Sequence, residues 1–462
     1  MLRKAHVMAC KLFGSSGIRG LVNEELTPDL AVKIGYALGE VTEAGYVLIA
    51  RDTRTSGLML EKAITSGLIA SGAQVQLLGI QPTPVLAYLT RKLKADAGVM
   101  ITASHNPPQY NGIKIFDESS ASIDEEKQSK IEEILRSGVF KLASWRDLGQ
   151  AIYKDESQEY VEMLLNRVKL DREWRLIVDP GCGATSEIAP TIFRKSGCKV
   201  VAINAQMDGF FPGRKPEPNF ESLGYLAKTV KSLGADVGIA FDGDGDRVAF
   251  IDEKGNFVSF DRVLAVYASN VVEKSHGGIV ATNVEASMSI EELVESKGGK
   301  VVRTKVGDVY VARAVKKHNA VFGGEPCGAW IHPEFHYCPD GILSALLLLR
   351  NLEERDQKLS EFIAEAIEHP MLRENIPCPN ELKYEVLERA EKHLLEILRN
   401  YREVSKVDGV RISTDDGWIL IRASGTEPLI RVTVEGVSSE KAKSMMEAAL
   451  ASIKKAEESL KE

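Results

Sequence analysis

The fold is decided by Tyr46-Val-Leu-Ile-Ala50 and by the three segments after it: a polar loop over 51–57, a helical pattern, and then Ser71-Gly-Ala-Gln-Val-Gln-Leu-Leu78. The order of strand, polar loop, amphipathic helix, glycine and strand predicts a βαβ unit. The glycine just after the helix supplies the left-handed conformation of a helix C-cap at low steric cost.

The same order recurs twice further along the chain. Leu176-Ile-Val-Asp179 leads through a loop and a helix to Ser196-Gly-Cys-Lys-Val-Val-Ala202, and Gly278-Ile-Val-Ala281 leads in the same way to Gly298-Gly-Lys-Val-Val-Arg303. Any α/β protein contains several such units by chance, but the recurring glycine favours a true triplication. We therefore expect three similar α/β domains with mixed, largely parallel sheets and right-handed crossovers.

The last 90 or so residues have a different pattern. A charged amphipathic helix over 382–402 precedes short strands near 409–412, 417–421 and 429–434, and a final helix begins at 438 and ends near 460. This predicts a smaller α+β domain, in which two helices back an antiparallel sheet. The expected domains are 1–150, 151–257, 258–370 and 371–462.

The composition is that of a soluble globular protein. An apolar fraction of 44% and a charged fraction of 27% in 462 residues exclude intrinsic disorder, a collagen-like fibre and a disulfide-stapled miniprotein. A net charge of -8 argues against a broad nucleic-acid surface, although a small anion site needs only a few donors. We expect no membrane span and no signal peptide. The six cysteines lack a CxxC pair, which indicates reduced thiols and a cytoplasmic location.

The segment Thr102-Ala-Ser-His-Asn-Pro-Pro108 comes after an apolar strand over 97–101. Ser104 therefore lies at the carboxyl end of a strand, where open α/β sheets bind ligands. With His105 and Lys114 nearby, its hydroxyl could be a nucleophile or a phosphorylated side chain. The alternative is a loop in which Asn-Pro-Pro only makes a turn.

The segment Phe241-Asp-Gly-Asp-Gly-Asp-Arg247 comes after a second apolar strand. Asp242, Asp244 and Asp246 alternate along the chain, and converging carboxylates of this kind suit Mg²⁺ or Ca²⁺. An EF-hand is rejected because Arg247 stands where that loop needs glycine and because a strand precedes the loop. A merely solvated acidic turn is disfavoured, since three crowded carboxylates repel one another without a cation.

Three further segments carry groups suited to phosphates and sugars. In Arg422-Ala-Ser-Gly-Thr-Glu-Pro428 an arginine, two hydroxyls and backbone N–H groups could cradle phosphate, although an ordinary hairpin loop is the alternative. Gly14-Ser-Ser-Gly-Ile-Arg-Gly20 offers Arg19, and Gly323-Gly-Glu-Pro-Cys-Gly-Ala-Trp330 offers Glu325 to ligand hydroxyls. The whole set favours phosphoryl transfer on a polyhydroxylated substrate. The absence of GxxxxGK[ST] from the sequence disfavours a P-loop kinase.

These motifs together resemble those of the α-D-phosphohexomutase superfamily, over the whole chain and in the same order. TASHNP resembles the phosphoserine loop, DGDGDR the metal loop, GEPCGAW the sugar-specificity loop and RASGTEP the phosphate-binding loop. The resemblance implies three similar α/β domains and a smaller fourth domain around a central cleft. It also implies a reversible shift of phosphate between C1 and C6 of a hexose.

The resemblance implies roles for individual residues. Ser104 would carry a phosphate and pass it to the substrate, giving a hexose 1,6-bisphosphate, and one Mg²⁺ per chain would be held by Ser104, Asp242, Asp244 and Asp246. The other residues implied in catalysis are Lys114, Arg247, Arg19 and His105. The residues implied in substrate binding are Lys305, Glu325, Cys327, Arg422, Ser424, Gly425, Thr426 and Arg431.

Two departures from the family pattern bear on the substrate and on the general base. Bacterial relatives usually read GE-x-S-G-H in the sugar loop, whereas this chain has Cys327 and Ala329 in place of the serine and histidine. Asp308 stands where many relatives carry a histidine after Lys-x-Gly, so a histidine base there is not implied. The overall pattern favours glucosamine phosphate. Mannose or glucose phosphate is the alternative, and so is a catalytically silent sugar-phosphate-binding relative.

Overall fold

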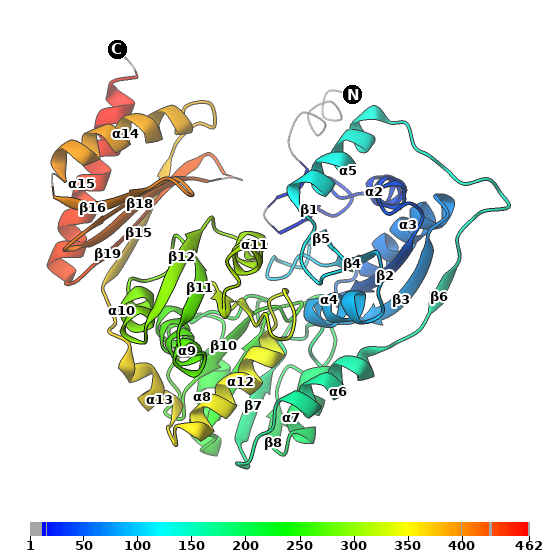
Figure 1. The fold of residues 1–462 in the computed structure, drawn as a ribbon, viewed down its shortest axis with the longest axis horizontal. Coiled ribbons are helices and arrows are strands. Elements are labelled where there is room, and N and C mark those ends of the chain that lie inside the picture. Colours follow the sequence, from blue (N-terminus) through cyan, green and yellow to red (C-terminus); the bar gives the residue numbers. More distant parts are fainter. Residues whose placement is uncertain (1–11, 15, 399, 425–426, 461–462) are drawn as a thin grey trace. The chain divides into compact units, whose positions relative to one another are not determined.

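The computed structural model describes residues 12–14, 16–398, 400–424 and 427–460 (Figure 1). The chain forms two compact units, one of Met1–Phe260 with Cys327–Ile363 and the other of Asp261–Pro326 with Ala364–Glu462. No helix in the described part of the chain has the length and apolar character that a membrane crossing needs. The five cysteines in that part form no disulfide with one another.

The first unit begins with a six-stranded sheet in the order β1-β5-β4-β2-β3-β6. Strands β2, β3, β4 and β6 are parallel, and β5 pairs with both β4 and β1 in the antiparallel sense. The strands are β1 (Ile18–Leu21), β2 (Tyr46–Arg51), β3 (Gln74–Ile80), β4 (Ala97–Ile101), β5 (Tyr110–Phe116) and β6 (Ala151–Tyr153). The helices are α2 (Pro28–Val41), α3 (Gly57–Ala70), α4 (Thr83–Lys92) and α5 (Glu125–Ser137).

Apolar side chains of α2, α3 and α5 pack with those of the sheet into one core. Local chemistry sets where the helices start. At α2, the Thr27 hydroxyl accepts a hydrogen bond from the Leu30 N–H, and Pro28 fills the first turn, where its missing N–H costs nothing. At α5, the Asp124 carboxylate caps the Lys127 N–H in the same way.

A second sheet in the first unit has the order β10-β9-β7-β8. Strands β8 and β9 run parallel to β7, and β10 returns antiparallel to β9. The strands are β7 (Arg175–Asp179), β8 (Lys199–Ala202), β9 (Val237–Phe241) and β10 (Val248–Ile251), and the short β14 (Trp330–Ile331) also belongs to this unit. The helices are α6 (Ser157–Arg167), α7 (Ile188–Lys195), α8 (Gly224–Leu233), α12 (Gly341–Glu354) and α13 (Leu359–Phe362).

The second unit contains a third parallel arrangement, in which β12 and β13 both pair with β11. The strands are β11 (Gly278–Asn283), β12 (Gly299–Thr304) and β13 (Phe322–Gly324), and the helices are α9 (Phe260–Lys274), α10 (Ser289–Ser296) and α11 (Asp308–His318).

The three repeats predicted from the sequence are confirmed by these pairings. The units β2-α3-β3, β7-α7-β8 and β11-α10-β12 each join two parallel neighbours through one helix. The local order β3-β2-β4 recurs as β8-β7-β9 and β12-β11-β13. Gly72, Gly197 and Gly298, the glycines just after the three helices, have φ values of 96°, 91° and 77°, a region that side chains disfavour. The recurring glycine therefore marks a backbone requirement of each repeat.

The C-terminal part of the second unit is a five-stranded sheet in the order β15-β19-β18-β17-β16, and every pair in it is antiparallel. The elements are β15 (Met371–Pro377), α14 (Lys383–Ile397), β16 (Tyr401–Ser405), β17 (Val410–Thr414), β18 (Gly417–Ala423), β19 (Leu429–Gly436) and α15 (Ser439–Glu458). Side chains of both helices pack with the sheet in one core. The predicted fold class, three largely parallel α/β sheets and a smaller α+β domain, is confirmed.

Two details of the C-terminal prediction are wrong. The helix expected over 382–402 ends at Ile397, because Tyr401–Ser405 pairs with β17 as an edge strand. The strand β15 is absent from the prediction. In the first unit, β6 pairs with β3, so the first sheet continues to Tyr153.

Candidate active site

Ser104 lies in the loop after β4, and it is the centre of the site in the first unit. Its side chain is buried, and its hydroxyl donates a hydrogen bond of 2.6 Å to Asp242 Oδ2. The Nδ1 atom of His105 lies 3.2 Å from the same hydroxyl. Ser104 has a φ of 51°, a left-handed conformation that is uncommon for a residue with a Cβ and that clusters at functional sites.

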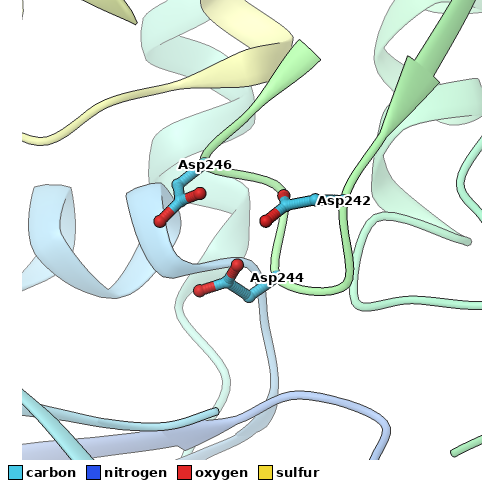
Figure 2. A group of neighbouring side chains, drawn as sticks. All are labelled: Asp242, Asp244 and Asp246. Carbon is cyan, nitrogen blue, oxygen red and sulfur yellow. The ribbon is translucent and has the colours of Figure 1, made fainter. Parts of the chain in front are cut away.

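The three aspartates lie in the loop that joins β9 to its antiparallel neighbour β10. Figure 2 shows their carboxylates turned toward a common point, and one ligand oxygen from each lies within 4.8 Å of the others. All three are buried. The loop is therefore a return between two strands, which agrees with the rejection of an EF-hand.

The donor set of this loop fits a hard divalent cation. Asp244 Oδ1 and Asp246 Oδ1 are buried and accept no hydrogen bond within the described part of the chain. A buried carboxylate oxygen without a partner is costly unless a cation meets it. Carboxylate oxygens are the ligands that Mg²⁺ prefers. This buried aspartate triplet is thus a group that could hold a metal ion.

Lys114, on β5, offsets part of the negative charge of the loop between β9 and β10 (residues 242–247), which we call the acidic loop. Its ammonium lies 2.7 Å from Asp244 Oδ2 and 2.6 Å from Asp246 Oδ2, and all three side chains are at least nine-tenths buried. Lys114 lies opposite Met100, which is one residue before the end of β4, so the strand pairing places the lysine near the carboxyl end of β4. Thr83, at the start of α4, donates a further hydrogen bond to Asp244 Oδ2.

The local charges move the pKa values of two aspartates in opposite directions. Burial, and then the charges of Asp246 and Asp244, raises the pKa of Asp242 well above its usual range. Burial also acts to raise the pKa of Asp244, but the ammonium of Lys114 and hydrogen bonds from Lys114 and Thr83 outweigh it and hold that pKa below its usual range. Lys114 thus keeps Asp244 ionised.

Two arginines lower the pKa of His105. The positive charge of Arg247, then burial, and then the charge of Arg19 lower the pKa of His105 to about 2, so its imidazole is neutral at neutral pH. Arg19 donates a hydrogen bond of 2.8 Å to the Asn106 side chain, and Arg247 lies 4.0 Å from Asp246. The structure thus brings together all the residues predicted for catalysis and for the metal.

The predicted substrate-binding residues lie mostly in the second unit. Glu325 comes directly after β13 and is buried, and its Oε1 accepts hydrogen bonds of 2.8 Å from Asn283 Nδ2 and from the Gly307 N–H. Arg422, at the end of β18, pairs with Glu285 at 2.6 Å and with Asp408 at 3.7 Å.

The other six residues predicted to bind substrate are placed as follows. The ammonium of Lys305 lies 5.7 Å from the centre of the Tyr310 ring, and Arg431 pairs with Glu427 at 2.8 Å. Ser424 Oγ accepts a hydrogen bond from the Glu427 N–H. Cys327 is half-buried and belongs to the first unit. Gly425 and Thr426 lie outside the described residues.

Several residues near Ser104 are not indicated by any sequence motif. Asp52 and Arg54 lie in the polar loop of the first repeat. Arg54 donates a hydrogen bond to the carbonyl oxygen of Ser104, in the loop after β4 that we call the serine loop (residues 102–109), and Asp52 accepts one from the Thr102 hydroxyl. Thr83 contacts the acidic loop although 161 residues separate it from Asp244. Only the position of Asp52 and Arg54, directly after a buried parallel strand, could have pointed to them.

Comparison with known families supports the chemistry that this geometry suggests. Models of the four domains of the phosphoglucomutase/phosphomannomutase family match the chain one after another: the α/β/α domains I, II and III at residues 10–141, 158–255 and 259–369, and the C-terminal domain at 375–452. The chain belongs to the phosphoglucomutase/phosphomannomutase family. The predicted resemblance to phosphohexomutases is thereby confirmed, and with it the prediction of an enzyme of this isomerase class.

Relatives within the phosphoglucomutase/phosphomannomutase family match nearly the full length. A Pyrococcus abyssi protein named "Probable phosphoglucosamine mutase" is 46% identical, over 95% of this chain and 97% of that protein. A Methanopyrus kandleri protein of the same name is 47% identical, over 94% and 96%. The crystal structure of a family protein from Burkholderia thailandensis aligns with a TM-score of 0.88 at 27% identity, over 97% of this chain and 98% of that one.

Proposed function

We propose that the chain interconverts glucosamine 6-phosphate and glucosamine 1-phosphate through a phosphoserine at Ser104 and a hexose 1,6-bisphosphate. The observation that carries the proposal is the buried Ser104 hydroxyl, 2.6 Å from Asp242 and in a loop beside the ammonium of Lys114. The choice of glucosamine rests on the names of the relatives at 46% and 47% identity.

In the first half of the reaction, the bond between phosphorus and Ser104 Oγ breaks and a bond to a hydroxyl oxygen of the sugar phosphate forms. The serine oxygen regains a proton as the sugar hydroxyl loses one. In the second half, the bond between the other phosphorus of the bisphosphate and its sugar oxygen breaks, a bond from that phosphorus to Ser104 Oγ forms, and the freed sugar oxygen gains a proton as the serine hydroxyl loses one. Lys114 and Arg247 offset negative charge on the transferring group. Bound Mg²⁺, held by Asp242, Asp244, Asp246 and the Ser104 phosphate, would supply a Lewis acid for the same charge.

The predicted substrate-binding residues would bind the part of the substrate that does not react. Arg422, Ser424, Gly425, Thr426 and Arg431 would grip the distal phosphate, and Lys305, Glu325 and Cys327 would contact the sugar. Arg422 is held at 2.6 Å by Glu285, so an arriving phosphate would replace one carboxylate partner by another anion. We also propose that the four domains meet near residues 150, 257 and 370. A cytoplasmic location is proposed as well.

A second candidate is a phosphomannomutase or phosphoglucomutase, which the name of the matching family favours. A silent sugar-phosphate-binding relative is the least favoured interpretation, because this chain keeps Ser104, Lys114 and all three aspartates in contact. The three interpretations differ in turnover and in the covalent state of Ser104.

Turnover of glucosamine, mannose and glucose 6-phosphates should be compared on one preparation with Mg²⁺ and a trace of the matching bisphosphate. We expect glucosamine 6-phosphate to have the highest kcat/KM, and glucosamine as the poorest substrate would contradict the choice of sugar. Intact-mass analysis after incubation with a hexose bisphosphate should show one added phosphate that is lost in Ser104→Ala. A protein that never gains this phosphate is not a mutase of this kind.

A further inference from the structure

We propose that Arg54 is a positioning residue that holds Ser104 in the conformation needed for phosphoryl transfer, an inference that rests on the proposed function. Arg54 lies in the loop after β2 and is 1% exposed. All five of its N–H donors are used. Nε donates to Asp52 Oδ2 (3.0 Å), Nη1 to the carbonyl oxygens of Pro107 (2.6 Å) and Tyr110 (2.9 Å), and Nη2 to those of Ser104 (2.9 Å) and Asn106 (2.6 Å).

The serine loop needs such support because Ser104 has a left-handed backbone, with a φ of 51°. A non-glycine residue persists in this region only where its surroundings over-determine it. Both polar backbone atoms of Ser104 are held. Thr102 Oγ1 accepts a hydrogen bond of 2.8 Å from the Ser104 N–H, and Arg54 donates to the Ser104 carbonyl oxygen.

One buried carboxylate connects these two supports. Asp52 Oδ2 accepts a hydrogen bond of 2.6 Å from the Thr102 hydroxyl and one of 3.0 Å from Arg54 Nε. Asp52 is fully buried, as is Thr102. The buried side chains of Asp52, Arg54 and Thr102 are therefore connected by hydrogen bonds. Together they hold both the N–H and the carbonyl oxygen of Ser104.

This support bears directly on the reacting oxygen. The acidic loop packs so closely on the carbonyl held by Arg54 that a Cβ on Gly243 would lie 2.5 Å from the Ser104 oxygen. A shift of the serine backbone would therefore move Ser104 Oγ relative to Asp242, which it now contacts at 2.6 Å. A displacement of about 1 Å at a reacting group can lower the rate by about a hundredfold.

The second repeat uses the same device on the acidic loop. Arg214 is buried, pairs with Asp179 at 3.1 Å and donates a hydrogen bond of 2.6 Å to the carbonyl oxygen of Phe241, the residue before Asp242. Asp179 ends β7, and Asp52 comes directly after β2, the corresponding strand of the first repeat. In both repeats a buried aspartate–arginine pair thus holds the loop that carries the reactive groups.

The test compares Arg54→Lys and Thr102→Val with the matched control Arg51→Lys. Lysine keeps the charge opposite Asp52 but has only three N–H donors on one atom, so it cannot reproduce the planar set of contacts. Arg51 lies just before the same loop but pairs with Glu61 at 3.3 Å. For each variant we would measure kcat and KM for the best hexose phosphate, the thermal midpoint, and the fraction of Ser104 phosphorylated by intact mass.

We expect Arg54→Lys and Thr102→Val to lower kcat per phosphorylated site by about a hundredfold, with KM changed less than about threefold and Arg51→Lys like the parent. A lowered thermal midpoint with the parent's kcat per phosphorylated site would overturn the inference, since Arg54 would then only stabilise the fold. If Arg54→Lys does not fold, Thr102→Val decides in the same two ways. A parent without turnover or Ser104 phosphorylation would overturn the proposed function and this inference with it. Normal turnover in parent and variants would overturn the inference alone.

Discussion

Replacement of Lys114 by methionine would show how the acidic loop is neutralised. The Lys114 ammonium lies within 2.7 Å of two buried carboxylates, those of Asp244 and Asp246. Methionine keeps a similar length of side chain without the charge. Removal of one partner from a buried ion pair costs about 3–5 kcal/mol, because the remaining charge stays buried without compensation. Here two carboxylates lose the ammonium that pairs with both, while Thr83 and Arg247 remain beside them, so we expect the free energy of unfolding to fall by about 3–5 kcal/mol without divalent cation.

The same substitution has a smaller expected effect on stability when Mg²⁺ is present. Asp244 Oδ1 and Asp246 Oδ1 are both buried and accept no hydrogen bond in the described part of the chain, and a cation on them would replace the positive charge that the variant has lost. Urea unfolding of parent and variant in EDTA and in excess Mg²⁺ would measure this. We expect Mg²⁺ to stabilise the variant by at least about 2 kcal/mol more than the parent. Turnover measured with Mg²⁺ should still fall sharply, because the variant lacks the ammonium that is proposed to offset charge on the transferring phosphate.

Lys130→Met is the matched control, because Lys130 is an exposed lysine on α5 of the same unit. A surface substitution of this kind changes the free energy of unfolding by no more than about 0.5 kcal/mol. Equal losses for the two variants in EDTA would refute the argument that Lys114 neutralises the loop. So would a loss at Lys114 that is the same with and without Mg²⁺.

Three other substitutions test the remaining parts of the site and the fold. Ser104→Ala should abolish turnover while calorimetric binding of the hexose phosphate stays within about threefold of the parent, and near-normal turnover would refute the nucleophile. Arg422→Ala should raise KM at least about tenfold, since the proposed contact with the distal phosphate is lost, and an unchanged KM in steady-state assays would exclude that contact. Burial is the largest cause that raises the pKa of Asp261 to about 6, so the folded protein binds its proton more tightly than the unfolded chain, and stability falls as pH rises from about 4 to about 6. Asp261→Asn should remove this fall and stabilise the protein at pH 7 by about 2 kcal/mol, after allowance for partial solvent exposure. A variant whose unfolding free energies at pH 5 and pH 7 keep the parent's difference would count against this.

The repeats could be predicted from the sequence because their signals are local. Each unit needs an apolar strand, an amphipathic helix and a glycine in a left-handed conformation, and all three lie within about 35 residues. The acidic loop and the serine loop were predictable for a related reason. Each carries unusual residues directly after an apolar strand, at the edge of the sheet where ligands bind.

The missed strands lack such a local signal. Tyr401–Ser405 lies at the sheet edge, is mostly exposed and contains two charged residues, so its sequence continues the charged helical pattern before it. It is a strand because β17 offers a ladder of hydrogen bonds, which is a tertiary cause. Met371–Pro377 is also an edge strand with an exposed centre, and it pairs with β19 more than 50 residues later. For the same reason Arg54 could not be assigned from the sequence, since the carbonyl groups it holds come from a loop about 50 residues away.

The repeated topology also explains how three different loops can each carry candidate functional residues. The serine loop comes after β4, the acidic loop after β9 and Glu325 after β13, and each of these strands lies beside the first strand of its own repeat. In each repeat the loop leaves the carboxyl end of a buried parallel strand, and the helix and glycine that define the repeat come earlier in the chain. Substitutions in the loop therefore leave the packing of the βαβ unit intact. A hydroxyl, a carboxylate triplet and a single carboxylate can thus occupy the same topological position without a change of fold. What each loop still needs is a contact that holds its backbone in place. The buried pairs Asp52–Arg54 and Asp179–Arg214 provide this contact in the first two repeats.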